Sequence, residues 1–174
     1  ASHYAVVLHA LRANNVPALD MSMEGVGHTT IYGYNEERDY DMYQAFFDFC
    51  HYFLKNEASV CEYILPIQGK TNVSVTDDII IKFTGPIPES EIYDKVKVRN
   101  AKTGEVVHGA WESAFGGNEW TFTPYGLEGG TIYTVDVPAD VVAENGKAIQ
   151  SAKRASFRTS YETAFEVAEV ETTN

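Results

Sequence analysis

A histidine that follows two closely spaced glycines is the residue best placed for chemistry in this sequence. His28 comes directly after Gly25-Val26-Gly27. The two glycines release the backbone from a preceding strand and present the next side chain in a loop. An imidazole presented in this way can act as a general base, taking a proton from a nucleophile and returning it to a leaving group. A lone Gly-x-Gly-His also fits a histidine that only closes a turn, so the flanking elements decide between the two.

Those flanking elements are predicted to be a helix, a strand and a second helix. Apolar residues recur at intervals of three and four between residues 2 and 14, which is typical of one helix face. A partly alternating run at residues 16–23 predicts a short strand that ends just before His28. A second helix is expected at residues 42–54, capped by Asp39 or Asp41. Its aromatic stripe needs a large partner surface.

The order of these segments resembles the C-terminal end of the α/β-hydrolase superfamily, specifically bacterial esterases, lipases and prolyl-oligopeptidase-like peptidases. SHYAVVLHALRANNVP resembles the helix before the last strand, ALDMSMEGVGH the last strand with its histidine loop, and DYDMYQAFFDFCHYFLK the closing helix. The resemblance implies that residues 1–56 are an αβα remnant of this fold and that His28 is the catalytic base of a serine hydrolase. The family places its serine elbow and its acid before the histidine, and only 27 residues precede His28. We therefore expect this chain to be inactive alone.

The other histidines and the cysteines give no sign of a metal site or a cofactor. His3, His9 and His51 lie in helical patterns and His108 in a strand pattern, where packing or surface roles are expected. Cys50 and Cys61 are not part of a CxxC pair, so zinc has no support. A disulfide between them remains open, although the apolar helical pattern around Cys50 favours a free buried thiol.

From residue 72 onward the apolar pattern changes to a period of two, with turn residues about every ten positions. This pattern predicts an antiparallel β-sandwich of about seven strands. The expected strands are Val73–Val75, Ile79–Phe83, Lys95–Asn100, Val106–Ser113, Glu119–Thr123, Thr131–Val137 and Ala155–Thr159. The residues expected to fill the two inner faces are Ile79, Ile81, Phe83, Val96, Val98, Trp111, Trp120, Phe122, Tyr133, Val135 and Phe157.

This block resembles the bacterial Ig-like domains that are appended to secreted hydrolases and surface-layer proteins. DIIIKFTGPI resembles their opening strand, WTFTP followed by LEGGTIYTV their central motif, and SFRT their closing strand. The resemblance implies a spacer or accessory module, in some cases a weak binder of carbohydrate or of a cell surface. The fold itself does not fix a binding site.

Few residues of the sandwich are candidates for binding. Trp111, Trp120 or Tyr125 could form an aromatic platform for a sugar, although a tryptophan on an alternating strand is more often part of the core. Asp77-Asp78 could join a calcium site, although a turn between strands explains the pair better.

Composition and charge limit the classes of partner that this chain can have. The net charge of −12 makes nucleic acid an unlikely ligand, and no apolar run is long enough to span a membrane. We expect a hydrolase-like segment at 1–56, a linker at 57–70, an Ig-like sandwich at 71–160 and an acidic tail at 161–174, which together make an α+β chain. Because residues 1–56 lack the sheet that their aromatic helix would cover, we also expect self-association through this segment.

Two functions follow from these observations. In the first, the chain is the C-terminal part of a serine hydrolase that cleaves carboxylic esters or peptides, with His28 as its base and an Ig-like accessory domain. In the alternative, it is a non-catalytic bacterial surface or carbohydrate-binding Ig-like protein. Both predict a secreted, periplasmic or cell-surface location in a bacterium.

Overall fold

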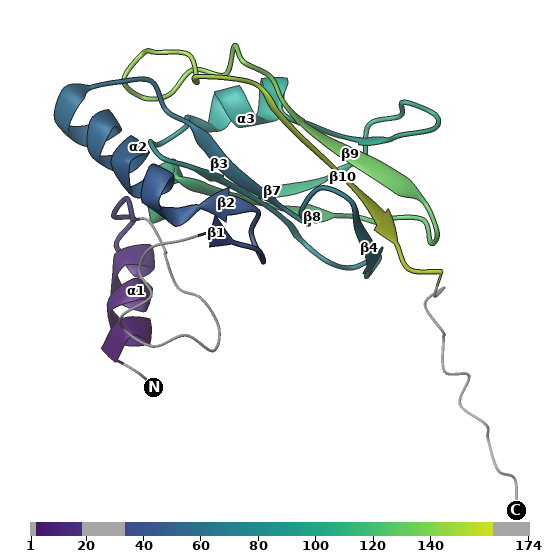
Figure 1. Cartoon of the computed structure of the whole chain (residues 1–174). Helices are drawn as coiled ribbons and strands as arrows, with labels where there is room; N and C mark the ends of the chain where they lie inside the picture. The colour runs from purple at the N-terminus through teal and green to yellow at the C-terminus, as the bar shows by residue number, and fades with distance from the viewer. Residues whose placement is uncertain (1–2, 19–33, 162–174) are drawn as a thin grey trace, which may run out of the picture.

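Two four-stranded sheets form a sandwich in the computed structural model, which describes residues 3–18 and 34–161 (Figure 1). The sheets have the strand orders β4-β10-β9-β6 and β3-β5-β8-β7, and a two-stranded pair, β1-β2, lies beside them. The helices are α1 (His3–Ala13), α2 (Met42–Lys55), α3 (Glu89–Lys95) and the 3₁₀ helix η1 (Phe115–Gly117). The strands are β1 (Tyr34–Asn35), β2 (Tyr40–Asp41), β3 (Cys61–Leu65), β4 (Lys70–Val73), β5 (Ile79–Phe83), β6 (Lys97–Asn100), β7 (Gly109–Ala114), β8 (Glu119–Pro124), β9 (Ile132–Val137) and β10 (Lys153–Thr159).

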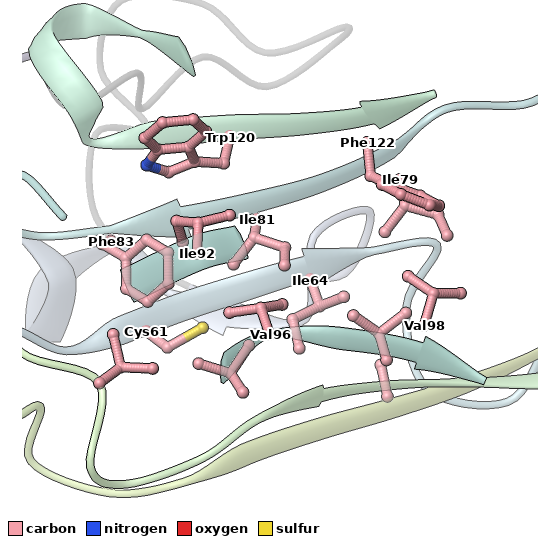
Figure 2. Close-up of a cluster of buried hydrophobic side chains, with 14 of the residues drawn as sticks. Cys61, Ile64, Ile79, Ile81, Phe83, Ile92, Val96, Val98, Trp120 and Phe122 are labelled. Carbon is pink, nitrogen blue, oxygen red and sulfur yellow. The ribbon is translucent and has the colours of Figure 1, made fainter. Parts of the chain in front are cut away.

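The core lies between the two sheets and consists of the residues that alternate inward along the strands. Figure 2 shows side chains of β3, β5, β6 and β8 meeting there, together with Ile92 of α3. All but one of the predicted inner-face residues belong to this buried cluster, and Trp111 packs against its edge. The prediction of a sandwich core is confirmed, because the period of two placed the same residues on the inner faces.

The segment expected to be a linker contains a strand of the sandwich. β3 pairs antiparallel with β5, with Ile64 opposite Ile81 and Leu65 opposite Ile80. Its residues Cys61, Glu62, Tyr63 and Ile64 are all buried, because the inner sheet face lies on one side and the α2 region on the other. A strand buried on both faces shows no alternation, so the sequence pattern did not reveal it.

The remaining strands lie close to their predicted positions, with differences at the ends. β5 has the predicted bounds, whereas β4 begins three residues earlier than expected, at Lys70, because it pairs with β10. This pairing is parallel, and it is extended by hydrogen bonds from Gly69 N to Ser156 O and from Ser160 N to Val73 O. The first strand of this sheet in the chain is therefore joined to the last.

Helix α3 was not predicted. It begins after Pro88, which is its N-cap, and has Glu89 and Glu91 in its first turn and Lys95 in its last. This charge order suits the helix dipole, and proline before an acidic turn is a start signal. The helix buries Ile92 in the core and precedes β6 directly, which is why β6 begins at Lys97.

Helix α2 begins at a side-chain N-cap and packs on the sandwich through one face. Asp41 is the cap, and its Oδ1 accepts hydrogen bonds from Tyr43 N and Gln44 N. The buried residues of the helix are Met42, Ala45, Asp48 and Tyr52, whereas Phe46, Phe47, Phe53 and Leu54 are exposed. Most of the aromatic stripe that was expected to need a partner surface therefore faces away from the sandwich.

Helix α1 matches its prediction and is attached to the end of the sandwich near η1. Arg12 forms an ion pair with Glu119 of β8, and the Lys82 ammonium of β5 donates to Ala18 O at 2.7 Å. Residues 16–18 are not a strand, and the remainder of the predicted strand lies outside the described residues. In the described part of the chain there is no αβα layer of the hydrolase type, and no helix there is long and apolar enough to cross a membrane.

Candidate ligand-binding face

The outer face of the β4-β10-β9-β6 sheet is open and polar. Inward residues alternate with outward ones on each strand, so that Val98, Val135 and Phe157 point to the core. The register then places outward side chains in rows across the strands. One row is Lys97, Asp136 and Arg154, and the next is Arg99, Thr134 and Ser156.

A hollow of about 520 Å³ lies at the end of this face where β6 begins and β9 ends. We call it the basic hollow. It contains five cationic side chains and one carboxylate, that of Asp136. Its lining residues are Lys95, Lys97, Arg99, Asp136, Val137, Pro138, Ala152, Lys153 and Arg154.

Two of the five cations are neutralised by carboxylates. Lys95 Nζ lies 2.8 Å from Glu91 Oε2 and 3.8 Å from Asp140 Oδ2, and the pKa of Lys95 is raised, chiefly by its hydrogen bond with Glu91. Arg154 Nε pairs with Asp136 Oδ1. These pairs use the acidic groups closest to the hollow.

The other three cations contact backbone carbonyl groups. Lys97 Nζ donates to Tyr93 O at 2.7 Å, Arg99 Nη1 to Gly104 O at 3.2 Å and Lys153 Nζ to Glu62 O. A carbonyl orients a cation without cancelling its charge. Among the residues that the structure describes, no carboxylate forms an ion pair with Lys97, Arg99 or Lys153.

A second hollow, of about 610 Å³, lies at the opposite end of the same face. We call it the tyrosine hollow, because the exposed ring of Tyr161 forms one wall. The ring lies against Gly130, where an added Cβ would come within 2.5 Å of it and where φ is +68°. Only glycine allows this approach. The lining residues are Asn100, Ala101, Lys102, Thr103, Glu128, Gly130, Thr131, Ile132, Arg158 and Tyr161.

A third hollow, of about 390 Å³, lies between α2 and β3 and is acidic. Asp39, Asp41, Asp48 and Glu62 line it, together with Lys153 from the basic hollow. Burial raises the pKa of Glu62 to about 8, and the nearby charge of Asp48 adds to this effect. No group of three or more His, Cys, Asp or Glu side chains within residues 3–18 and 34–161 is arranged to hold a metal ion.

His28, the histidine predicted to be a catalytic base, lies outside the described residues, and the other histidines were not expected to form a site. His9 and His108 are exposed, and His51 Nδ1 lies 3.3 Å from Glu57 Oε2 near the end of α2. The side chain of His3 is outside the described part.

The aromatic and acidic candidates of the sandwich have different places. Trp120 is buried, and its Nε1 donates to Gly117 O at 3.1 Å, while Trp111 is partly buried against Phe122. Tyr125 is 77% exposed and lines none of the three hollows. Asp77 and Asp78 accept hydrogen bonds from Ser74 N and Thr123 Oγ1.

Both cysteines are free thiols. Cys50 is half-buried on α2, and Cys61 is buried on β3. Burial raises the pKa of Cys61 to about 12, so this thiol stays protonated at neutral pH. The pattern around Cys50 favoured a free buried thiol; the thiol is free, but it is half-buried.

The residues of the two hollows on the open face were not predicted as a site. They come from segments near residues 97, 136 and 154, which are far apart in the sequence. One signal was present: on each of these strands charged residues alternate with core residues, as in KVR, VDV and KRA. Alternation indicates that the charges face outward, but only the strand order places them side by side.

The two packed sheets define an Ig-like domain. Residues 56–159 match the family model described as a bacterial Ig-like domain, and the chain belongs to this family. This match confirms the resemblance of the second block, and the comparisons give the hydrolase resemblance no support. A search of curated proteins finds no match.

Three of the similar solved structures are an S-layer protein, CopC and a copper resistance protein. The S-layer protein rSbsC(31-844) has 17% identity and a TM-score of 0.45, over 70% of this chain and 16% of that chain. CopC from Methylosinus trichosporium OB3b has 16% identity and a TM-score of 0.47, over 62% and 99%. PcoC, a methionine rich copper resistance protein from Escherichia coli, has 15% identity and a TM-score of 0.45, over 59% and 99%. The chain thus spans about a sixth of the S-layer protein.

Proposed function

We propose that this chain is a non-catalytic module of a bacterial protein located outside the cytoplasm, and that it binds carbohydrate on the outer face of the β4-β10-β9-β6 sheet. Membership of the bacterial Ig-like domain family supports the accessory role. The open sheet face, with a hollow at each end, supplies a surface on which an extended ligand can lie. The function resides in this face and not in the fold as such.

The exposed ring of Tyr161 is the observation that carries the carbohydrate proposal. It is 77% exposed and lies over Gly130, at the wall of a hollow whose volume is in the range of small-ligand sites. An amphipathic ring held in this way can stack on the apolar face of a sugar. Asn100, Thr103 and Thr131 line the same hollow and supply groups that can bond hydroxyls.

The test compares two tyrosines that are equally exposed. Wild type, Y161A and Y125A are incubated with insoluble polysaccharide from bacterial cell walls, and the bound fraction is measured over a range of protein concentrations. We expect Y161A to weaken binding about fivefold or more, as truncation of an anchoring aromatic does. Y125A is expected to bind like wild type, because Tyr125 lies outside the hollows. Equal binding by all three proteins would contradict the role of Tyr161, and no binding by wild type would contradict the function.

The proposed location is testable in the source bacterium. Cells are separated into cytoplasmic, periplasmic or wall, membrane and medium fractions, and the protein is detected with an antibody against the sandwich. We expect it in the fractions outside the cytoplasm, whether secreted, periplasmic or attached to the surface. Its recovery with a cytoplasmic marker enzyme would contradict the proposal.

The hydrolase interpretation is retained as a second candidate for one reason. The exposed aromatic side of α2 is suited to cover a further apolar surface. In this second proposal, the chain is the C-terminal part of a serine hydrolase that acts on esters or peptides, with His28 as the base. The test is to sequence the coding DNA upstream of the codon for Ala1. A G-x-S-x-G elbow followed by an acid would support the second candidate, and their absence from the complete reading frame would remove it.

A further inference from the structure

We infer that the ligand of the open face is an acidic polysaccharide, and that the basic hollow binds its carboxylate or phosphate groups through Lys97 and Arg99. This inference rests on the proposed function and adds the charge of the ligand to it. The site is distinct from the tyrosine hollow, because the two lie at opposite ends of the same strands.

The basic hollow differs in charge from the chain as a whole. The chain as a whole has a net charge of −12, yet the basic hollow contains five cations and one carboxylate. After Lys95 and Arg154 are paired, the outward-facing Lys97 and Arg99 remain without a carboxylate ion pair among the described residues. Electrostatic interactions are screened over about 8–10 Å at physiological salt, so a group bound in the hollow responds mainly to these cations.

The cations are also held in place before a ligand binds. Lys97 and Arg99 are half-buried, and each makes one hydrogen bond to a carbonyl group. An ammonium has three N–H donors and a guanidinium five, so each group retains donors for an anion. A long side chain that is already oriented loses less conformational entropy on binding.

A polymer fits the face better than a single small anion. The row of Arg99, Thr134 and Ser156 joins the two hollows, and Arg158 continues the positive charge into the tyrosine hollow. From Lys97 to Asn100 the strand advances about 10 Å, which is a distance that a chain of a few sugars spans. A sugar chain along the strands can therefore stack on Tyr161 and place acidic groups against Lys97 and Arg99.

The small number of free cations on the open face also argues against nucleic acid as the ligand. Double-stranded DNA has a negative charge every ~1.7 Å along its axis, and tight binding requires many cations over a long surface. The open face offers few free cations, and the surrounding protein is strongly acidic. A polymer with one acidic group per sugar suits a hollow with two such cations.

The experiment measures binding of the full chain to two pectin-type polymers by affinity electrophoresis in native gels. Polygalacturonate has a carboxylate on every sugar, and its fully methyl-esterified form has the same backbone without charge. We compare wild type, K97Q/R99Q and the control K55Q/K147Q, which makes the same change in net charge at residues outside the basic hollow. Thermal unfolding monitored by circular dichroism verifies that all three proteins are folded.

We expect wild type to bind polygalacturonate, and K97Q/R99Q to weaken that binding tenfold or more, because charge-assisted hydrogen bonds are lost. The control variant is expected to bind like wild type, and the methyl ester to bind wild type as weakly as polygalacturonate binds K97Q/R99Q. A phosphate-bearing polysaccharide, phosphomannan, is tested in parallel. Preference for it over polygalacturonate, with the same loss in K97Q/R99Q, would identify phosphate as the acidic group and support the inference.

Three results overturn the inference and are distinguishable from failure of the proposed function. Equal binding of the methyl ester, or unchanged binding by K97Q/R99Q, shows a neutral sugar ligand and leaves the proposed function standing. Tighter binding of a DNA duplex than of any polysaccharide shows a different class of ligand. If no polysaccharide binds wild type, including the cell-wall material, the proposed function fails and the inference fails with it.

Discussion

Glu62 is an acidic side chain held almost entirely out of water. It is 6% exposed on β3, and its Oε1 has no hydrogen-bond partner in the structure. Asp48 of α2 lies nearby and opposes a second negative charge, while Lys153 and Lys82 only partly offset this effect. The protonated form of Glu62 is therefore favoured in the folded protein at neutral pH.

This environment predicts a pH dependence of stability. The pKa of Glu62 rises from 4.5 to about 8 on folding, so the folded state binds the extra proton between these values. The free energy of unfolding should therefore fall as pH rises from about 4.5 to 8 and level off above, by on the order of 3 kcal/mol. E62Q removes the titrating group and should flatten this part of the curve. Urea unfolding at several pH values measures the difference.

The control for this experiment is E112Q, which removes a charge from the exposed Glu112 of β7. It should keep the pH dependence of wild type. Parallel curves for wild type and E62Q across the whole range would show that Glu62 titrates normally.

Gly85 is the second residue with a measurable role, because Tyr52 of α2 lies directly over it. A Cβ at this position would lie 2.2 Å from the tyrosine ring. We expect G85A to destabilise the protein by about 1–3 kcal/mol, as overpacking in a buried contact does. In a Y52A background the same substitution should cost much less, because the opposing ring is gone. Equal costs in both backgrounds, measured by urea unfolding, would show that the contact is not tight.

At the scale of elements, α2 has the reverse of the usual arrangement for a helix on a protein surface. The polar Asp48, which accepts a hydrogen bond from Gln44 Nε2, faces the sandwich, and phenylalanines face outward. Tyr43, Phe46, Phe47 and Phe53 are between 44% and 46% exposed, and Leu54 is 82% exposed. A contiguous apolar surface of this kind is typical of an interaction site.

We therefore expect the isolated chain to self-associate through α2, with an apparent mass that rises with concentration in light scattering. F46K/F47E replaces two exposed rings with good helix formers of opposite charge, and should give a monomer. A matched control, Y93S/Y125S, removes two exposed tyrosines elsewhere and should behave like wild type. A wild-type chain that stays monomeric at the highest concentration reached would contradict the expectation.

Sequence periodicity predicts some of these elements and not others. Strands with one solvent-exposed face were predictable, since Tyr133, Val135 and Val137 of β9 alternate with more exposed residues. β3 was not, because α2 covers its second face and removes the alternation. The side of α2 that is buried was not predictable either. Periodicity identifies an apolar stripe, but the contact of Tyr52 with Gly85 decides which side faces the sandwich.

At the scale of the whole molecule, the predicted sandwich and its core are confirmed by one general rule, that inward residues recur every second position. The open face with its basic hollow depends on more than this rule. It requires the order β10-β9-β6, which brings residues 97, 136 and 154 together. Strand order is set by connections and long-range packing, so a single sequence without its fold does not reveal such a site.

The parallel pairing of β4 with β10 has a mechanical consequence. The two strands run in the same direction; β3 precedes β4 in the chain, and the sandwich ends after β10. Tension applied to the two ends of the domain therefore acts first on β3 and, once β3 has detached, pulls β4 and β10 in opposite directions along their length. Their hydrogen bonds are then loaded together instead of opening one by one.

In force spectroscopy on the chain held at residues 56 and 161, we expect one cooperative rupture. The K70P variant, which disturbs the pairing, should lower its force, whereas a gradual extension of wild type without a peak would contradict this. A domain built in this way can resist a force applied along its two ends.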